Sequence, residues 1–131
     1  MSVQIYPVRT GSVKIKKSQK IRKPGGMLRV LADPDWTEWL PIYSWVIEHS
    51  EGIFIVDTGD TSRTVTDPDY FPRWHPYYRN SVKMDIHPEE EIGPQLKKMG
   101  IKGNDIRKVI LTHFHTDHAG GLHHFNDSQV L

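Results

Sequence analysis

The sequence predicts an α/β fold in which helices pack against a β-sheet, and three observations predict it. Residues 42–48 and 53–57 are rich in β-branched and aromatic residues around a polar turn, which is typical of a β-hairpin. Residues 88–100 carry apolar side chains at helical spacing, and residues 109–111 form a short, fully apolar strand. This strand, helix, strand order indicates a layered α/β arrangement.

The composition is that of one globular domain without a charged surface field. The chain has 131 residues, and a domain of this size buries roughly two-thirds of its unfolded surface. Hydrophobic residues make up 37% of the chain, charged residues make up 25%, and the formal net charge is +1. Neither nucleic acid nor a membrane is therefore expected as a partner. The absence of cysteine leaves His, Asp and Glu as metal ligands.

The N-terminal third is predicted to hold short strands at the edge of the sheet. Residues 3–5 and 13–15 alternate between apolar and polar, as strands with one solvent-exposed face do. The basic run of residues 14–23 is either a solvated loop or a nucleic-acid patch, and the loop is favoured because no aromatic residue is interleaved with the charges. Residues 24–26 break the chain, and residues 27–32 are predicted to form a strand. No export signal is evident, so we expect a soluble, cytoplasmic protein.

The second strand of the hairpin ends where an apolar run gives way to Asp57-Thr58-Gly59. A carboxylate at a strand end is placed to point into a site. The following residues 61–84 hold three prolines and a group of large aromatic side chains without a clear period. This long irregular segment is expected either to cap a pocket or to form a separate packing cluster.

The predicted helix at residues 88–100 begins with a proline and three glutamates, which suit the positive end of a helix dipole. Pro94 lies inside the pattern. It either kinks the helix or delays its start, because an interior proline removes one backbone hydrogen bond.

A histidine-rich segment directly follows the apolar strand. Five of the eight histidines of the chain fall within the twelve residues 113–124. In a strand-like segment alternate side chains share a face, so His113, His115 and Asp117 are expected to converge, with His118 brought beside them by the turn into the next helix. Two imidazoles and a carboxylate–imidazole pair are ligands that zinc prefers. The alternative is a set of surface or core histidines, or an adventitious metal trap.

The remaining histidines are expected to lie outside this site. Adjacent residues on a helix do not face each other, so at most one of His123 and His124 could look toward the site, and a surface role is favoured for both. His75 and His87 lie in loop-like contexts and carry no assignment.

The string H-x-H-x-D-H at residues 113–118 resembles the signature of the metallo-β-lactamase superfamily. Asp57-Thr58-Gly59, about fifty residues earlier, resembles the first motif of that family. Residues 41–122, including residues 67–71 and 94–101, look most like the branch that contains N-acyl-homoserine lactonases.

The resemblance implies a role for each motif residue. His113 and His115 would bind one zinc ion, and Asp117 and His118 would bind a second. Asp57 would support the site by holding a ligand rather than the metal.

The resemblance also implies a zinc-dependent hydrolase that opens lactone or ester bonds of a small molecule with a metal-bound hydroxide. Asp117 would then be a catalytic residue that orients the metal and carries a proton to the leaving group. Thioester, phosphodiester or β-lactam hydrolysis uses the same metal core, and the motif does not choose among these reactions. The candidates for an apolar substrate pocket, each with plain packing as its alternative, are Met27, Trp36, Tyr70 and Phe71, together with Trp39 and Trp74.

The fold implied by the resemblance is an αββα sandwich of two similar halves, of which residues 1–131 would cover about the N-terminal half. The second half would supply one more histidine for each zinc and a carboxylate that bridges them. We therefore expect the chain alone to bind metal weakly and to be inactive, because each ion would find only two ligands. It would be completed by the rest of a longer enzyme, by a homo-oligomer or by a second chain. The alternative hypothesis is a non-catalytic half-domain that only associates.

Overall fold

A six-stranded mixed sheet with the strand order β4-β1-β2-β3-β5-β6 forms the centre of the computed structural model, which describes residues 2–131. Met1, the first residue of the segment in which no export signal was found, lies outside the described residues. The strands are β1 (Gln4–Ile15), β2 (Leu40–His49), β3 (Gly52–Val56), β4 (Val82–Asp85), β5 (Ile106–Ile110) and β6 (Gln129–Val130). The α-helices are α1 (Lys17–Lys20), α2 (Gly26–Ala32), α3 (Arg63–Thr66), α4 (Pro76–Asn80), α5 (Ile92–Lys98) and α6 (Thr116–Ala119). Three 3-10 turns are η1 (Pro88–Glu90), η2 (Gly103–Asp105) and η3 (Leu122–His124).

Strand pairing in the sheet is antiparallel on one side of β3 and parallel on the other. β2 and β3 form the predicted hairpin, with Trp45 opposite Val56 and His49 opposite Gly52, so this prediction is confirmed. β1 pairs antiparallel with β2 and with β4. On the other side, β3 pairs with β5, and β5 with β6, in parallel. A parallel pair needs a long crossover, and the chain between β3 and β5 supplies it with α3, α4 and α5.

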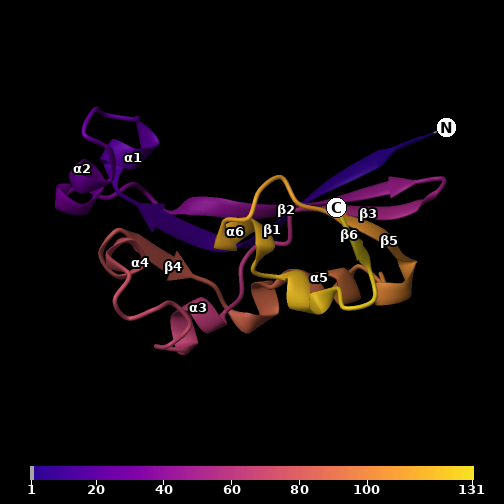
Figure 1. Ribbon diagram of the computed structural model, residues 1–131. Helices are drawn as coiled ribbons and strands as arrows, with labels where there is room; N and C mark the ends of the chain where they lie inside the picture. The colour runs from indigo at the N-terminus through magenta and orange to yellow at the C-terminus, as the bar shows by residue number, and fades with distance from the viewer. Residues whose placement is uncertain (1) are drawn as a thin grey trace.

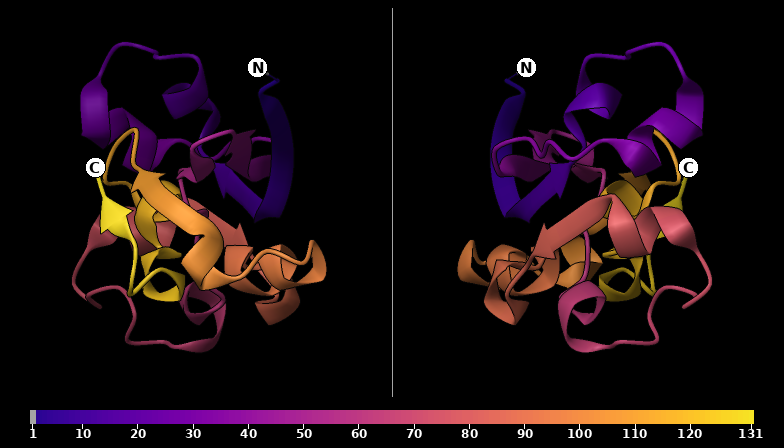
Figure 2. Two further views of the ribbon diagram at one scale, coloured as in Figure 1. Left: turned by 90° about the vertical axis from the view of Figure 1, so that its right-hand side faces the viewer. Right: turned by 90° about the vertical axis from the view of Figure 1, so that its left-hand side faces the viewer.

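One face of the sheet is buried under α5. Val46, Ile55 and Val109 on three adjacent strands are fully buried and belong to one core cluster with Ile92 and Leu96 of α5. Figure 1 shows α5 on the lower side of the sheet, with α1 and α2 together at the upper left. The side views of Figure 2 show the same separation, with α1 and α2 at the top and α3 and α5 at the bottom. The predicted α/β arrangement is therefore confirmed.

The other face of the sheet is apolar and open. Tyr43 and Trp45 of β2 are 40% and 41% exposed, and Ile5 of β1 is 57% exposed. Their neighbours in sequence point to the α5 side, as the two-residue period of a strand requires. Contiguous apolar surface of this kind is typical of a face that another layer covers.

The structure corrects the prediction of a strand at residues 27–32, which form helix α2 instead. Met, Leu, Arg and Ala are good helix formers, and a strand here would need a free neighbour in the sheet. β1 is one long strand rather than two edge pieces, with an irregularity between Arg9 and Ser12, and it lies inside the sheet between β2 and β4.

Two further predictions concern residues 61–84 and the helix at residues 88–100. The segment at residues 61–84 is not wholly irregular, because it holds α3, α4 and β4. The delayed start of the predicted helix is confirmed, since α5 begins at Ile92 after the turn η1. Pro94 then lies in the first turn, where backbone N–H groups have no partner within the helix, so its missing N–H costs no hydrogen bond.

Among residues 2–131, no helix has both the length and the apolar character needed to cross a lipid bilayer. The expected cytoplasmic location stays a prediction.

Replacing Ile55 with Ala should lower the free energy of unfolding by about 2–5 kcal/mol, because it opens a cavity beneath α5. Ile21→Ala is the matched control: Ile21 is 59% exposed, so this change should cost at most about 0.5 kcal/mol. Urea unfolding of both variants measures the difference. Equal losses would contradict the placement of the core between β3 and α5.

Candidate metal centre

Two neighbouring parallel strands, β3 and β5, end at the same edge of the sheet. Val56 lies beside Ile110 in the register, and the backbone N–H of Asp57 donates to the Ile110 carbonyl oxygen at 2.8 Å. The loops that follow these two strands therefore start side by side. The carboxyl ends of parallel strands are where α/β proteins usually place their ligands.

The carboxylate of Asp57 joins these two loops. It accepts hydrogen bonds from the Thr112 backbone N–H at 2.8 Å, from the Thr112 hydroxyl at 2.8 Å and from His118 Nδ1 at 2.7 Å. Burial raises the pKa of Asp57, but the Thr112 and His118 hydrogen bonds outweigh it and hold the pKa below its usual value. A neutral His118 that donates Nδ1–H to a carboxylate keeps its Nε2 lone pair free for a metal.

The four predicted ligands lie close together beyond this anchor. The ring of His113 lies 4.6 Å from that of His115 and 3.9 Å from that of His118, measured between centroids. His118 Nε2 lies 3.3 Å from Asp117 Oδ2. The structure thus brings the ring of His113 against those of His115 and His118, and Asp117 against His118, but it does not place three ligand atoms of this set within 4.8 Å of one another.

The route to this convergence differs from the expected strand alternation. β5 ends at Ile110, residues 111–115 form no strand, and α6 begins at Thr116. His115 is the residue before α6, and Asp117 and His118 lie within it. A bend of the chain, rather than one face of a strand, gathers the side chains.

The donor set fits zinc in its chemistry. Imidazole nitrogens with carboxylate oxygens are the usual zinc ligands when no cysteine is present, whereas a catalytic zinc usually takes three ligands from the protein. His113 and His115 are exposed, and the side chains of Asp117 and His118 are about 30% and 29% exposed. The site is therefore open on the side away from Asp57.

Two motif glycines allow the loops to pack without side chains between them. The Gly121 N–H donates to the Gly59 carbonyl oxygen at 3.1 Å, and a Cβ on Gly121 would lie 2.3 Å from the Thr58 carbonyl oxygen. Gly59 has φ +67°, and a Cβ there would lie 2.1 Å from Thr10 Oγ1. A side chain at Gly121 would push the two loops apart, and one at Gly59 would clash with Thr10 of β1.

Sequence reasoning missed three residues of this region: Thr112, Asp60 and Glu91. Asp60 is fully buried, accepts a hydrogen bond from the Thr61 backbone N–H at 2.8 Å, and leaves Oδ2 without a partner among the described residues. Burial, with smaller effects from Asp117 and Glu91, raises the pKa of Asp60 to about 6. Asp60 follows the Asp-Thr-Gly string directly, but only its burial marks it out.

The predicted pocket residues lie in different parts of the structure. Phe71 stacks on Tyr78, with centroids 4.2 Å apart, and touches Tyr70 edge to face. Trp36 instead lies under the Lys16 and Lys83 ammonium groups.

Phe71 and Tyr78 also line a cavity of about 410 Å³, which none of the four predicted ligands lines. Burial raises the pKa of Tyr78, with smaller effects from Tyr77, Asp117 and Asp60. Met27 lies exposed on α2, and Trp39 and Trp74 are exposed as well. Tyr70 and Phe71 therefore stay the better placed of the pocket candidates.

A mixed α/β sheet therefore carries a cluster of histidine and carboxylate side chains just beyond the ends of its parallel strands. The metallo-beta-lactamase superfamily matches residues 37–129, so the chain belongs to that superfamily.

Relatives of known type agree with this assignment. An N-acyl homoserine lactonase of Bacillus cereus is 29% identical over 92 residues, which are 70% of this chain and 36% of the relative. A probable metallo-hydrolase of Mycobacterium tuberculosis is 27% identical over 85 residues, which are 65% of this chain and 26% of the relative. The chain thus spans about a third of the length of the curated relatives it matches.

Solved structures resemble the whole chain. An N-acyl homoserine lactone hydrolase with the product N-hexanoyl-L-homoserine bound at its catalytic metal centre has a TM-score of 0.77 and 25% identity, and the match covers 99% of this chain and 48% of that one. A dizinc quorum-quenching lactonase, at 15% identity and a TM-score of 0.59, shares the fold; the match covers 98% of this chain and 41% of that one. The metallo-β-lactamase fold predicted for the chain is thereby confirmed.

Asp60→Asn should remove a pH dependence of stability. Because the folded state raises the pKa of Asp60 from 3.8 to about 6, the folded state binds more protons, and stability should fall as the pH rises from about 4 to about 6. In metal-free buffer the variant should be more stable than the parent above pH 7, by on the order of 2–3 kcal/mol, and similar to it at pH 4. Urea unfolding across this pH range measures both curves.

The exposed Asp127→Asn is the matched control and should leave the pH profile unchanged. A parallel pair of curves for Asp60→Asn and the parent would contradict a buried acid with a raised pKa.

Proposed function

We propose that the chain is the N-terminal half of a two-zinc hydrolase that opens lactone or ester bonds, of the N-acyl-homoserine lactonase type. The observation that carries the proposal is the Asp57 carboxylate, which holds Thr112 and His118 together so that His118 offers Nε2 beside Asp117. The relatives that match the chain are lactonases and metallo-hydrolases, which supports the same class of reaction.

Each residue of the centre has a proposed task. His113 and His115 would hold one ion, and Asp117 and His118 the other. Asp57 would keep His118 in the Nδ1–H tautomer and would not touch the metal. Zinc held there supplies Lewis acidity and a water of lowered pKa, which is the chemistry that ester and lactone hydrolysis needs.

Asp117 has a second proposed task as the proton carrier. Its carboxylate lies in the first turn of α6, and one of its oxygens faces His118 Nε2. A carboxylate at this place can take a proton from the attacking water and pass it to the leaving oxygen of an opened ring.

The proposal of a half-domain is supported by the open apolar face with Ile5, Tyr43 and Trp45. A second layer packed on this face would bury these side chains, and its residues would complete the coordination of two ions that find only two ligands each here. That layer would come from further residues of the same protein, from a second copy of the chain or from another chain. The same exposed face favours one alternative, a half-domain whose role is association without catalysis.

Asp57→Asn should weaken zinc binding by roughly 10–100-fold, the usual cost of losing a group that orients a metal ligand. The amide can donate to His118 Nδ1 and stabilise the tautomer that carries its proton on Nε2, where the metal would bind. Competition with a colorimetric zinc chelator measures the affinity. Asp127→Asn serves as the control and should bind zinc as the parent does, and unchanged affinity in Asp57→Asn would contradict the orienting role.

In the complete protein that contains this chain, Asp117→Asn should lower kcat for lactone opening by about 100-fold or more, because the variant loses both a ligand and the proton carrier. A panel of N-acyl-homoserine lactones, thioesters, phosphodiesters and a β-lactam identifies the substrate class. Lactone turnover that Asp117→Asn leaves unchanged would refute the mechanism, and turnover of another class alone would replace the lactonase proposal.

Native mass spectrometry of the purified protein separates catalysis from association. A chain heavier than 15.2 kDa, or an assembly with two zinc ions per completed site, is expected. A metal-free species of 15.2 kDa would contradict the hydrolase and favour the association module.

A further inference from the structure

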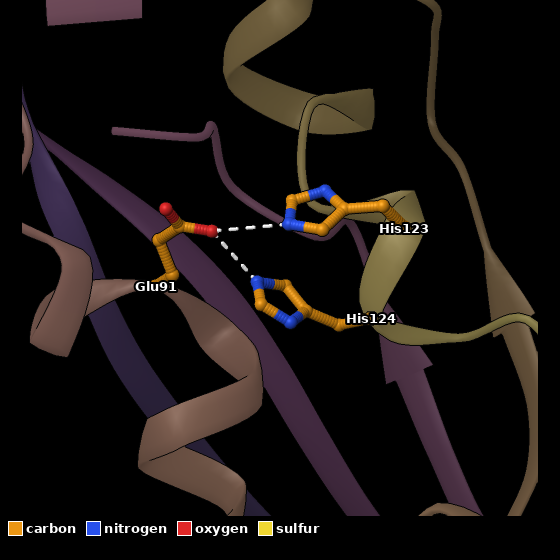
Figure 3. A group of neighbouring side chains, drawn as sticks. All are labelled: Glu91, His123 and His124. Carbon is orange, nitrogen blue, oxygen red and sulfur yellow. Dashed lines mark hydrogen bonds and ion pairs between the residues drawn. The ribbon is translucent and has the colours of Figure 1, made fainter. Parts of the chain in front are cut away.

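A second group of metal-binding side chains lies outside the four predicted ligands: Glu91 directly before α5, and His123 and His124 in η3. Figure 3 shows both imidazoles directed at one oxygen of the Glu91 carboxylate. His124 Nε2 lies 2.7 Å and His123 Nε2 lies 3.3 Å from Glu91 Oε2. A surface role for both histidines was expected, and it is wrong for His124, whose side chain is 21% exposed.

Hydrogen bonds from Ser62 fix one oxygen of the Glu91 carboxylate. Its Oε1 atom accepts hydrogen bonds from the Ser62 backbone N–H at 2.9 Å and from the Ser62 hydroxyl at 2.6 Å. Its side chain is only 8% exposed. Since Oε1 is occupied in this way, Oε2 is left as the oxygen that faces the histidines, in a fixed position.

The second ring nitrogen of His123 is also engaged. His123 Nδ1 lies 3.1 Å from the Gly120 carbonyl oxygen, which can only accept, so Nδ1 carries the proton. A neutral His123 then directs the lone pair of Nε2 at a carboxylate oxygen. In this tautomer two lone pairs face each other at 3.3 Å, an arrangement that a proton or a metal cation between them stabilises. This pattern, a backbone carbonyl on Nδ1 and a free Nε2, is the usual support of a metal-binding histidine.

We propose that Glu91, His123 and His124 form a second zinc site, separate from the His113 to His118 centre. Two imidazoles and one carboxylate are a three-ligand set of open zinc sites, and water would fill the fourth position. The three ligand atoms lie within 4.8 Å of one another. Tetrahedral ligands at about 2.1 Å from zinc lie roughly 3.4 Å apart, close to the His123 to Glu91 distance of 3.3 Å.

Only small movements would admit the ion. The contact of His124 with Glu91 is a hydrogen bond of 2.7 Å, which has to lengthen to roughly 3.4 Å, the separation of two tetrahedral zinc ligands, as the proton leaves. The His123 side chain is 52% exposed, so zinc and its water can reach the site from solvent.

The bound ion would connect three parts of the fold. Glu91 marks the start of α5, Ser62 belongs to the loop after Asp57, and η3 follows the histidine motif closely. Zinc here would connect the loop that carries the predicted catalytic ligands to helix α5. The inference does not depend on the proposed function, because it concerns binding at other residues.

The test begins with the full chain carrying His113→Ala, His115→Ala and His118→Ala, which removes ligands of both ions of the first centre. Titration with zinc chloride against a colorimetric chelator should still give one zinc per chain. Adding His123→Asn and His124→Asn should weaken this binding at least about tenfold, since losing even an orienting partner of a zinc ligand costs 10–100-fold. Adding His75→Asn and His87→Asn instead, a matched pair of histidine changes elsewhere, should leave it unchanged.

A second measurement reports on the ligands themselves. In long-range proton–nitrogen spectra of the same background, zinc should shift Nε2 of both His123 and His124. No zinc bound once His113, His115 and His118 are replaced, or binding that survives the loss of His123 and His124, would overturn the inference. Circular dichroism identifies any variant that fails to fold, and Glu91→Gln, which keeps an acceptor for Ser62, then replaces the double histidine variant.

Discussion

The meeting of two loops at the carboxyl ends of β3 and β5 is the constraint on which the rest of the site depends. Parallel pairing of these strands places Asp57 beside the residues that follow Ile110. The Asp57 carboxylate then bonds Thr112 in one loop and His118 at the start of the next helix. Glycines let these segments approach to backbone contact, as at Gly121 and Gly59. One buried carboxylate thus positions an imidazole that belongs to a different part of the chain.

The same packing concentrates negative charge. Three carboxylates of this region are buried: Asp57, Asp60 and Glu91. A fourth, Asp117, is partly exposed. Hydrogen bonds keep the pKa of Asp57 and of Glu91 low against the effect of burial, whereas Asp60 has a raised pKa. Buried carboxylates stay ionised where hydrogen bonds or a nearby cation stabilise the charge, so a histidine that reaches one can serve as a hydrogen-bond donor, a proton carrier or a metal ligand. Both groups of histidines in this protein face such a carboxylate, which links the predicted centre and the proposed second site to one electrostatic cause.

The sheet positions this polar region and leaves a further surface open. On one face, α5 covers Val46, Ile55 and Val109, which gives β3 and β5 a rigid base. On the other face Tyr43 and Trp45 remain exposed. An exposed apolar face of this kind is the surface on which the proposed second layer would pack.

The sequence by itself determined what local pattern can determine. The apolar hairpin, the delayed helix start at Pro94 and the H-x-H-x-D-H string each depend on neighbours in the chain, so spacing predicts them. The helix at residues 26–32 was missed because its sequence is apolar enough for either structure, and Met, Leu, Arg and Ala are good helix formers. Only the tertiary structure could decide that Thr112 holds Asp57, that Asp60 is buried, and that Glu91 meets His123 and His124. Those contacts join residues about thirty or more positions apart, and whether they form depends on the packing of β3, β5 and α5, which no local pattern encodes.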